Sequence, residues 1–182
     1  QSTLANPGSA VSAIMEGSRV LLVEVQALVV KSGYGMAKRS FLGVNPNRAN
    51  LIIATLEKSL GIELSSQDIF LNIIGGIKVD EPALDLCILL AILSSFYDKP
   101  LMDKIGVIGE IGLTGEIRAV PGVEKRLLEL KKMGFSACYL PSNNKKAYKY
   151  QDEIKPAYFK SVLALAEQFI KTRKGQTEAQ HG

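Results

Sequence analysis

Residues 75–97 read GGIKVDEPALDLCILLAILSSFY, and this stretch decides how the chain folds. A glycine pair leads into an acidic turn containing Pro82. Proline suits the first position of a helix, because the N–H that it lacks would have no partner there. From Pro82 to Tyr97 the sequence predicts a helix that is apolar nearly all round. Such a helix must be buried, so the other elements are expected to pack around it.

Strands and helices interleave on both sides of this segment. We expect helices at 48–60, 121–133 and 161–171, with Gly61 and Gly134 ending the first two. We expect strands at 19–30, 36–44, 68–74, 104–111, 115–120 and 137–140, with hairpins joining 19–30 to 36–44 and 104–111 to 115–120. This mixture of hairpins and interleaved helices predicts an α+β, or mixed α/β, fold with a sheet covered by helices.

The composition excludes several classes of protein. The chain has 182 residues, 47% of them hydrophobic and 22% charged, which suits one folded domain. Its longest apolar run, 86–93, is much shorter than the ~20 residues of a membrane span, and no signal peptide is recognisable. Cys87 and Cys138 lie apart in apolar contexts. We therefore expect reduced core thiols in a cytoplasmic protein without membrane contact.

Charge is distributed unevenly, although the net charge is only +4. Residues 61–120 carry four basic and nine acidic side chains, whereas residues 121–160 carry nine basic and four acidic ones. This asymmetry indicates an oriented field and a polyanionic partner. An ordinary solvated surface is the alternative, and charge alone favours that alternative.

The common motifs of catalysis and metal binding are missing from the sequence. There is no GxxxxGK[ST] loop, no HExxH and no cysteine–histidine cluster. The only histidine is His181, in the polar stretch at the end of the chain, so a Ser-His-Asp triad is implausible. We expect neither a cofactor nor a metal ion in this chain.

Three segments, in this order, resemble the proteolytic domain of Lon peptidases: GGIKVDEPALDL at 75–86, GEIGLTGEIRAVPGVEKRL at 109–127 and KKMGFSACYLP at 131–141. The resemblance implies a Lon-like fold, a sheet of the ribosomal protein S5 domain 2 type covered by helices. In that family a G-P-S-A-G type turn carries a nucleophilic serine at the start of the buried helix. A later lysine serves as the general base.

When the Lon motifs are aligned with this sequence position by position, both members of the dyad are missing. The serine position is Ala83, and the lysine position is Glu124. Lys125 is the next residue, but on a helix it points about 100° away. A methyl group cannot attack a carbonyl, so the resemblance implies a proteolytically inactive domain with no catalytic residues. Cys87, four residues after Ala83, is the conceivable replacement, but its apolar neighbours would raise a thiol pKa, and we expect a core side chain.

A closer resemblance is to the RadA family of bacterial DNA-repair proteins, also called Sms, in which a Lon-like domain follows a RecA-like ATPase core. This resemblance rests on EGSRVLLVEVQALV at 16–29 and on the NPNR and LEK motifs between 45 and 58. It implies that residues 1–16 are a segment or linker from the ATPase core and 17–172 the Lon-like domain. Residues 173–182 are polar and lack periodicity, so we expect a disordered tail. ATP and Mg are implied only for that core, which this chain lacks. The Lon-like domain of ComM-type motors shares the turn but fits residues 105–128 less well.

The RadA resemblance implies two compatible roles in DNA repair and recombination: DNA binding, and assembly of a hexameric ring for an ATP-driven branch-migration motor. It also allows a recombinase as partner of the parent protein. The candidate phosphate contacts are basic residues of the predicted hairpin and helices, namely Lys38, Arg39, Arg48, Lys125, Arg126, Lys131, Lys132, Lys145 and Lys146. For each one singly, a solvated surface group is the alternative. A pure oligomerisation module and a Lon-type peptidase are the rival functions.

Overall fold

The computed structural model describes residues 6–145 and 154–180, with 172–180 as backbone only. A seven-stranded sheet has the order β3-β4-β2-β1-β5-β8-β9, and β6 and β7 form a separate pair. The strands of the large sheet are β1 Ser9–Glu16, β2 Arg19–Lys31, β3 Arg39–Leu42, β4 Gln67–Ile73, β5 Ile105–Val107, β8 Ala137–Pro141 and β9 Lys155–Phe159. The helices are α1 Pro46–Leu60, α2 Asp85–Phe96, α3 Val123–Lys132 and α4 Val162–Gln180.

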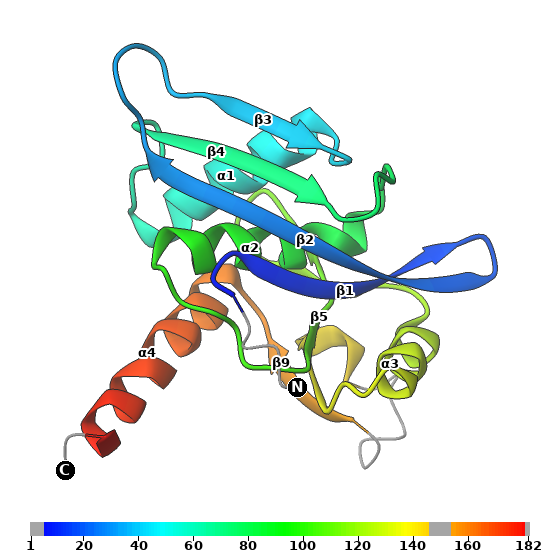
Figure 1. Cartoon of the computed structure of the whole chain (residues 1–182). Helices are drawn as coiled ribbons and strands as arrows, with labels where there is room; N and C mark the ends of the chain where they lie inside the picture. The colour runs from blue at the N-terminus through cyan, green and yellow to red at the C-terminus, as the bar shows by residue number, and fades with distance from the viewer. Residues whose placement is uncertain (1–5, 146–153, 181–182) are drawn as a thin grey trace.

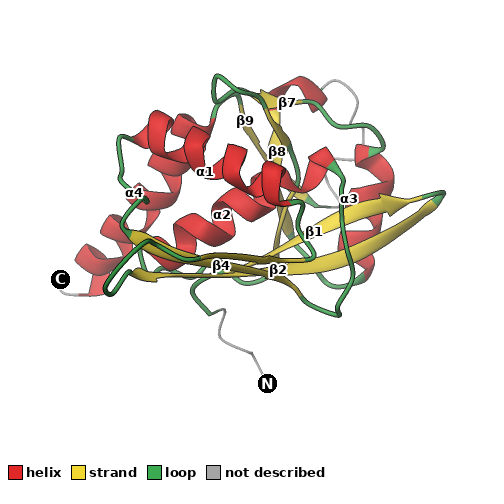
Figure 2. Ribbon diagram, turned by 90° about the horizontal axis from the view of Figure 1, so that it is seen from above, coloured by secondary structure: helices red, strands yellow, loops and turns green. Residues whose placement is uncertain are grey.

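The sheet is mixed, as the interleaved pattern predicts. Strands β1, β2 and β4 pair antiparallel, whereas the β3–β4, β1–β5, β5–β8 and β8–β9 pairs are parallel. Figure 1 shows the strands fanning across the molecule from β3 to β9. Figure 2 shows α1 and α2 lying over one face of β1, β2 and β4. Helix α3 contacts β1 and β2 through a second hydrophobic cluster, which includes Ala13 and Leu127.

Helix α2 forms the centre of the core, as its apolar sequence predicts. Every residue from Asp85 to Ser94 is buried. Its leucines and isoleucines join one large hydrophobic cluster with β2, β4, α1 and α4. The first turn differs from the prediction, because residues Pro82–Leu84 form a short 3-10 helix before α2 begins at Asp85. An all-apolar helix is stable only when it is covered on all sides, which explains its central place.

Helix α1 begins and ends at the expected signals. The Asn45 side chain accepts hydrogen bonds from the backbone N–H groups of Asn47 and Arg48, and Pro46 follows it. At the other end Gly61 adopts a left-handed conformation and donates to the Glu57 carbonyl at 2.8 Å. Local capping chemistry therefore sets both boundaries.

The predicted hairpin between 19–30 and 36–44 is wrong. Strand β3 does not pair with β2 but lies parallel to β4, with Phe41 opposite Leu71. Both edges of β2 are already occupied, by β1 and by β4. Helix α1 connects β3 to β4, and a helical crossover of this kind joins parallel neighbours. The second predicted hairpin is confirmed, since β6 Glu110–Ile111 pairs antiparallel with β7 Ile117–Arg118, although β5 is a separate strand.

Two strands were not expected from the sequence. Strand β1 falls within 1–16, the segment expected to precede the domain, yet it is central in the sheet and forms a two-residue hairpin with β2 around Gly17 and Ser18. Strand β9 extends the other end of the sheet beyond β8. The backbone of α4 also continues to Gln180, into the stretch expected to be disordered. A short 3-10 turn, Ser142–Asn144, follows β8.

Truncating the centre of α2 tests its role in the core. Leu89 is fully buried, so Leu89→Ala should lower the free energy of unfolding by about 2–5 kcal/mol through lost apolar contacts and a residual cavity. Urea unfolding followed by circular dichroism measures this change. The matched control is Leu163→Ala on the exposed face of α4, which should change stability by less than about 0.5 kcal/mol. Equal losses in the two variants would contradict the central position of α2.

Candidate functional site

The acidic turn before α2 is held by a buried arginine from α3. Arg126 is 1% exposed and pairs with a Glu81 carboxylate oxygen. Its Nε donates to the Pro121 carbonyl and its Nη1 to the Ala13 carbonyl, each at 2.9 Å. The other Glu81 oxygen accepts from the backbone N–H of Met15 at 2.8 Å. One ion pair therefore joins β1, the turn and α3.

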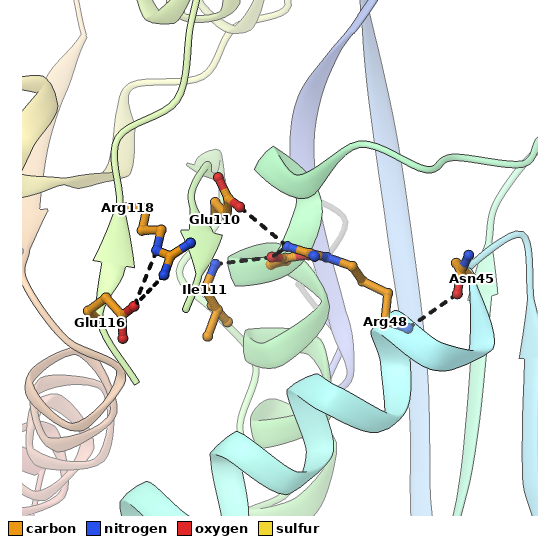
Figure 3. Close-up of polar contacts among 7 residues, drawn as sticks. Asn45, Arg48, Glu110, Ile111, Glu116 and Arg118 are labelled. Carbon is orange, nitrogen blue, oxygen red and sulfur yellow. Dashed lines mark hydrogen bonds and ion pairs between the residues drawn. The ribbon is translucent and has the colours of Figure 1, made fainter. Parts of the chain in front are cut away.

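A second arginine holds the first residue of α2. The buried carboxylate of Asp85 accepts from Arg48 Nε at 2.7 Å, from Arg48 Nη2, and from the Ile111 backbone N–H at 3.0 Å. Arg48 also lies 3.8 Å from a Glu110 carboxylate oxygen. Figure 3 shows the Arg48 side chain extending from α1 toward Glu110 and Ile111 of β6. This ion pair joins α1, α2 and the β6–β7 hairpin.

Burial governs the electrostatics of this second pair. Removal of Asp85 from water raises the pKa of its carboxyl group, although the hydrogen bonds from Arg48 and Ile111 act in the opposite direction. The hydrogen bond to Asp85 is the main reason why the pKa of Arg48 is raised. Both effects depend on the two groups remaining together, since either charge alone would be costly to bury.

Ala83, at the position of the Lon-type nucleophile, lies inside the protein. It is 3% exposed and belongs to a second hydrophobic cluster, with Ala13 of β1, Ile108, Val120 and Val123. Its carbonyl accepts from the Gly109 N–H at 3.0 Å, and Gly109 in turn accepts from the Leu86 N–H. Glu124, at the position of the general base, is exposed on α3. Ala83 is therefore a packing residue in this structure.

The cysteines are core side chains, as expected. Cys87 and Cys138 are both free thiols with no exposed surface. Burial raises the pKa of each thiol far above its ordinary value, so neither carries thiolate at neutral pH. Cys87 shares the large cluster with α2 rather than facing solvent beside Ala83. An apolar thiol in this state is a small hydrophobic side chain.

The basic residues predicted to contact DNA fall into three groups. Lys38, Lys125, Lys131, Lys132 and Lys145 are exposed, whereas Arg39 and Arg48 are partly buried and hydrogen bonded within the protein. The prediction that Arg126 belongs to an exposed basic face is wrong, because its guanidinium is buried against Glu81. Lys146 lies outside the described residues. Figure 1 shows Lys38's loop, between β2 and β3, at the end of the molecule opposite α3, so the structure does not gather these residues into one patch.

The buried position of Arg126 could have been found in the sequence. Val123, Arg126, Leu127 and Leu130 recur at helical spacing, and the structure buries all four. The acidic residues of the turn gave the complementary signal, since carboxylates at the start of a fully apolar helix require partners. Residue spacing alone does not identify Arg126 and Arg48 as the partners of Glu81 and Asp85, so neither ion pair was predicted.

The described part of the chain shows neither a metal-binding cluster nor a membrane-spanning helix. No group of three or more His, Cys, Asp or Glu side chains is arranged there to hold a metal ion. Among the described helices, none has the length and apolar character needed to cross a membrane.

Comparison with known proteins places the chain beside bacterial repair proteins. Residues 45–144 match the sequence profile of a family described as subunit ChlI of Mg-chelatase. Proteins named DNA repair protein RadA are 46% identical over 147 residues in Listeria monocytogenes, 49% over 137 in Streptococcus pneumoniae and 45% over 137 in Bacillus subtilis. These alignments cover 75–81% of this chain but only 30–33% of the relatives. The chain thus spans about a third of the length of these curated relatives.

Removing the buried guanidinium should destabilise the domain. Arg126→Ala leaves the Glu81 carboxylate and two backbone carbonyls without their donor, and we expect a loss of about 3–5 kcal/mol in the free energy of unfolding. Lys125→Ala, the exposed neighbour on α3, is the control and should change stability by less than about 0.5 kcal/mol. Urea denaturation of both variants measures the difference. Similar midpoints for the two variants would show that the ion pair does not support the fold.

The thiols offer a test that needs no substitution. Because Cys87 and Cys138 are buried with raised pKa values, a disulfide reagent at pH 8 should label neither of them until the chain unfolds. Labelling followed by absorbance should therefore track the unfolding rate, and both thiols should react at once in urea. Fast labelling of one thiol in the native protein would argue against this core.

Proposed function

Because this chain belongs to the family described as subunit ChlI of Mg-chelatase and is similar over most of its length to proteins named DNA repair protein RadA, we propose that it is the Lon-like domain of a RadA-type DNA repair protein. The domain acts through DNA binding and ring assembly rather than through peptide cleavage. The single observation that carries this proposal is 46% identity over 81% of the chain.

A proteolytically inactive domain fits the chemistry at the former dyad positions. Ala83 presents a methyl group that packs against Ile108, Val120 and Val123, and Glu124 replaces the lysine. The Arg126–Glu81 pair beside them is closed by hydrogen bonds to Ala13, Met15 and Pro121, so it has no free donor directed at a substrate. Cys87 is buried as a neutral thiol and offers no alternative nucleophile. The domain uses no cofactor of its own.

DNA contact is proposed for the exposed basic face of α3 and the segment that follows β8. Lys125 and Lys132 are seven residues apart and share one face of α3, with Lys131 beside it. Lys145 follows the turn Ser142–Asn144, close to Tyr158, whose ring lies 5.9 Å from its ammonium nitrogen. These lysines neutralise phosphates without reading base sequence. Arg126 is excluded from the interface because it supports the fold.

Assembly into a ring is the second part of the proposal. The acidic segment 61–120 and the basic segment 121–160 carry net charges of opposite sign, which would suit a head-to-tail contact between copies. A hexameric ring would gather several weak phosphate contacts on one DNA molecule. In the parent protein this ring would serve an ATP-driven branch-migration motor that cooperates with a recombinase, and ATP and Mg would bind to that motor.

A pure oligomerisation module is the alternative with a specific observation in its favour. Three of the arginines predicted to bind DNA, Arg39, Arg48 and Arg126, make hydrogen bonds within the protein instead. In that case the domain would assemble without touching DNA. The two functions differ in the response of DNA binding to salt and to charge reversal.

Charge reversal on α3 distinguishes the two functions. Fluorescence anisotropy with a labelled duplex should give an affinity that falls with salt, because binding releases counterions. Lys125→Glu/Lys132→Glu should weaken binding at least about tenfold at low salt and reduce the slope of log K against log salt by about 2. Molecular mass in solution, measured with and without DNA, reports assembly in the same samples.

The control variant makes the same change in net charge elsewhere. Lys58→Glu/Lys171→Glu places its substitutions on exposed positions of α1 and α4 and should leave the salt slope unchanged. A flat salt response in the unmodified chain, together with a stable oligomer, would favour the oligomerisation module. Equal effects of the two double variants would remove α3 as the interface.

A further inference from the structure

The loop between β2 and β3 exposes two large apolar side chains. Tyr34 is fully exposed and Met36 is 92% exposed, the highest values among the large hydrophobic residues that the structure describes. Gly33 and Gly35 flank the tyrosine, and Gly35 has a positive φ of 94°. A side chain with this exposure contributes nothing to the core. It is available for contact with something outside the domain.

The loop rises from a fixed base. The guanidinium of Arg39 donates to the carbonyls of Lys38, Leu64 and Gln67, and the Lys38 N–H donates to the Asp68 carboxylate at 2.7 Å. On the other stem, the Ser32 N–H donates to the Ser66 carbonyl at 2.9 Å. Both stems are therefore fastened to the entrance of β4. Arg39 acts as a positioning residue for the loop, which explains why it is not a free phosphate contact.

The loop's own charged residues all have one sign, although the Asp68 carboxylate lies at its base. Residues 31–39 read KSGYGMAKR, with three cations and no carboxylate. Lys31 is the last residue of β2 and Lys38 precedes β3, so one exposed lysine stands on each stem of the loop. Proteins that bind single-stranded nucleic acid combine an aromatic side chain with nearby lysines. Bases stack on the aromatic ring, and the lysines contact the phosphate backbone.

We propose that Tyr34 stacks on an unpaired base of single-stranded DNA while Lys31 and Lys38 contact the flanking phosphates. This inference rests on the proposed DNA-binding function, but it concerns a second site at the opposite end of the domain from α3. Met36 lies beside the base as an apolar wedge. Bases in a duplex are covered by their neighbours, so the loop favours single strands or frayed ends.

The charge pattern favours nucleic acid over a protein partner. An apolar pocket on a second copy could receive Tyr34 and Met36, but such a contact does not need lysines on both stems. Single-stranded DNA offers both unpaired bases and phosphates, so it would contact the aromatic ring and the lysines together. Docking of Tyr34 on a second copy is therefore the outcome that would overturn the inference.

Anisotropy titrations of the whole chain with oligothymidylate and with a duplex of equal length test the proposal. Tyr34→Ala should weaken single-strand binding by about 5- to 150-fold and leave the salt slope unchanged, because a stacked base but no phosphate contact is lost. Tyr34→Phe should restore binding, since the ring face remains. Lys38→Ala should instead reduce the salt slope by about 0.7. Duplex binding should respond little to Tyr34→Ala.

Leu113→Ala is the matched control, because Leu113 is an exposed apolar residue at the tip of the β6–β7 hairpin and should have no effect. If Tyr34→Ala binds like the unmodified chain, the loop inference fails while the proposed function stands. If Tyr34→Ala weakens binding and Lys125→Glu/Lys132→Glu does not, the loop remains and the α3 interface fails. Loss of oligomer mass in Tyr34→Ala without DNA would identify a contact between copies and overturn the inference. Absence of DNA binding by the unmodified chain would overturn both.

Discussion

The whole structure depends on burying the acidic start of α2. Helix α2 is apolar nearly all round, so it occupies the centre of the core and carries Asp85 into the interior, with Glu81 partly buried just before it. Carboxylates in such a place are costly unless they are paired and hydrogen bonded. Two arginines from different helices, Arg126 and Arg48, supply that pairing. The turn thereby becomes the junction of β1, α1, α3 and the β6–β7 hairpin.

This junction also determines which parts of the surface are available for function. Arg126 and Arg48 are committed to the fold, and Ala83 is packed into a hydrophobic cluster beside them. The residue at which the Lon resemblance would place a nucleophile is therefore part of the interior. In our proposal the functional groups are the lysines that remain exposed on α3 and the loop that carries Tyr34. None of these groups takes part in the two ion pairs, which agrees with a domain that works through its surface.

Much of the fold could be predicted because its signals are local. Asn45 and Gly61 cap the two ends of α1, and the apolar run predicts α2. The hairpin predicted between 104–111 and 115–120 is the one that β6 and β7 form. The partner of a strand is not a local property. Strand β3 pairs with β4 because β2 already has neighbours on both sides, and nothing within residues 36–44 records that competition.

The sequence by itself determined the buried helix, its acidic turn, the apolar setting of both cysteines and the identities of Ala83 and Glu124, where the Lon resemblance would place its dyad. These are matters of residue identity and short-range pattern. Only the tertiary structure decided which basic residues face solvent. Arg126 and Lys125 are adjacent and carry the same charge, yet one is buried against Glu81 and the other is exposed. The reason is physical: a charge enters the interior only where the fold brings an opposite charge to meet it, and that meeting joins residues 45 positions apart.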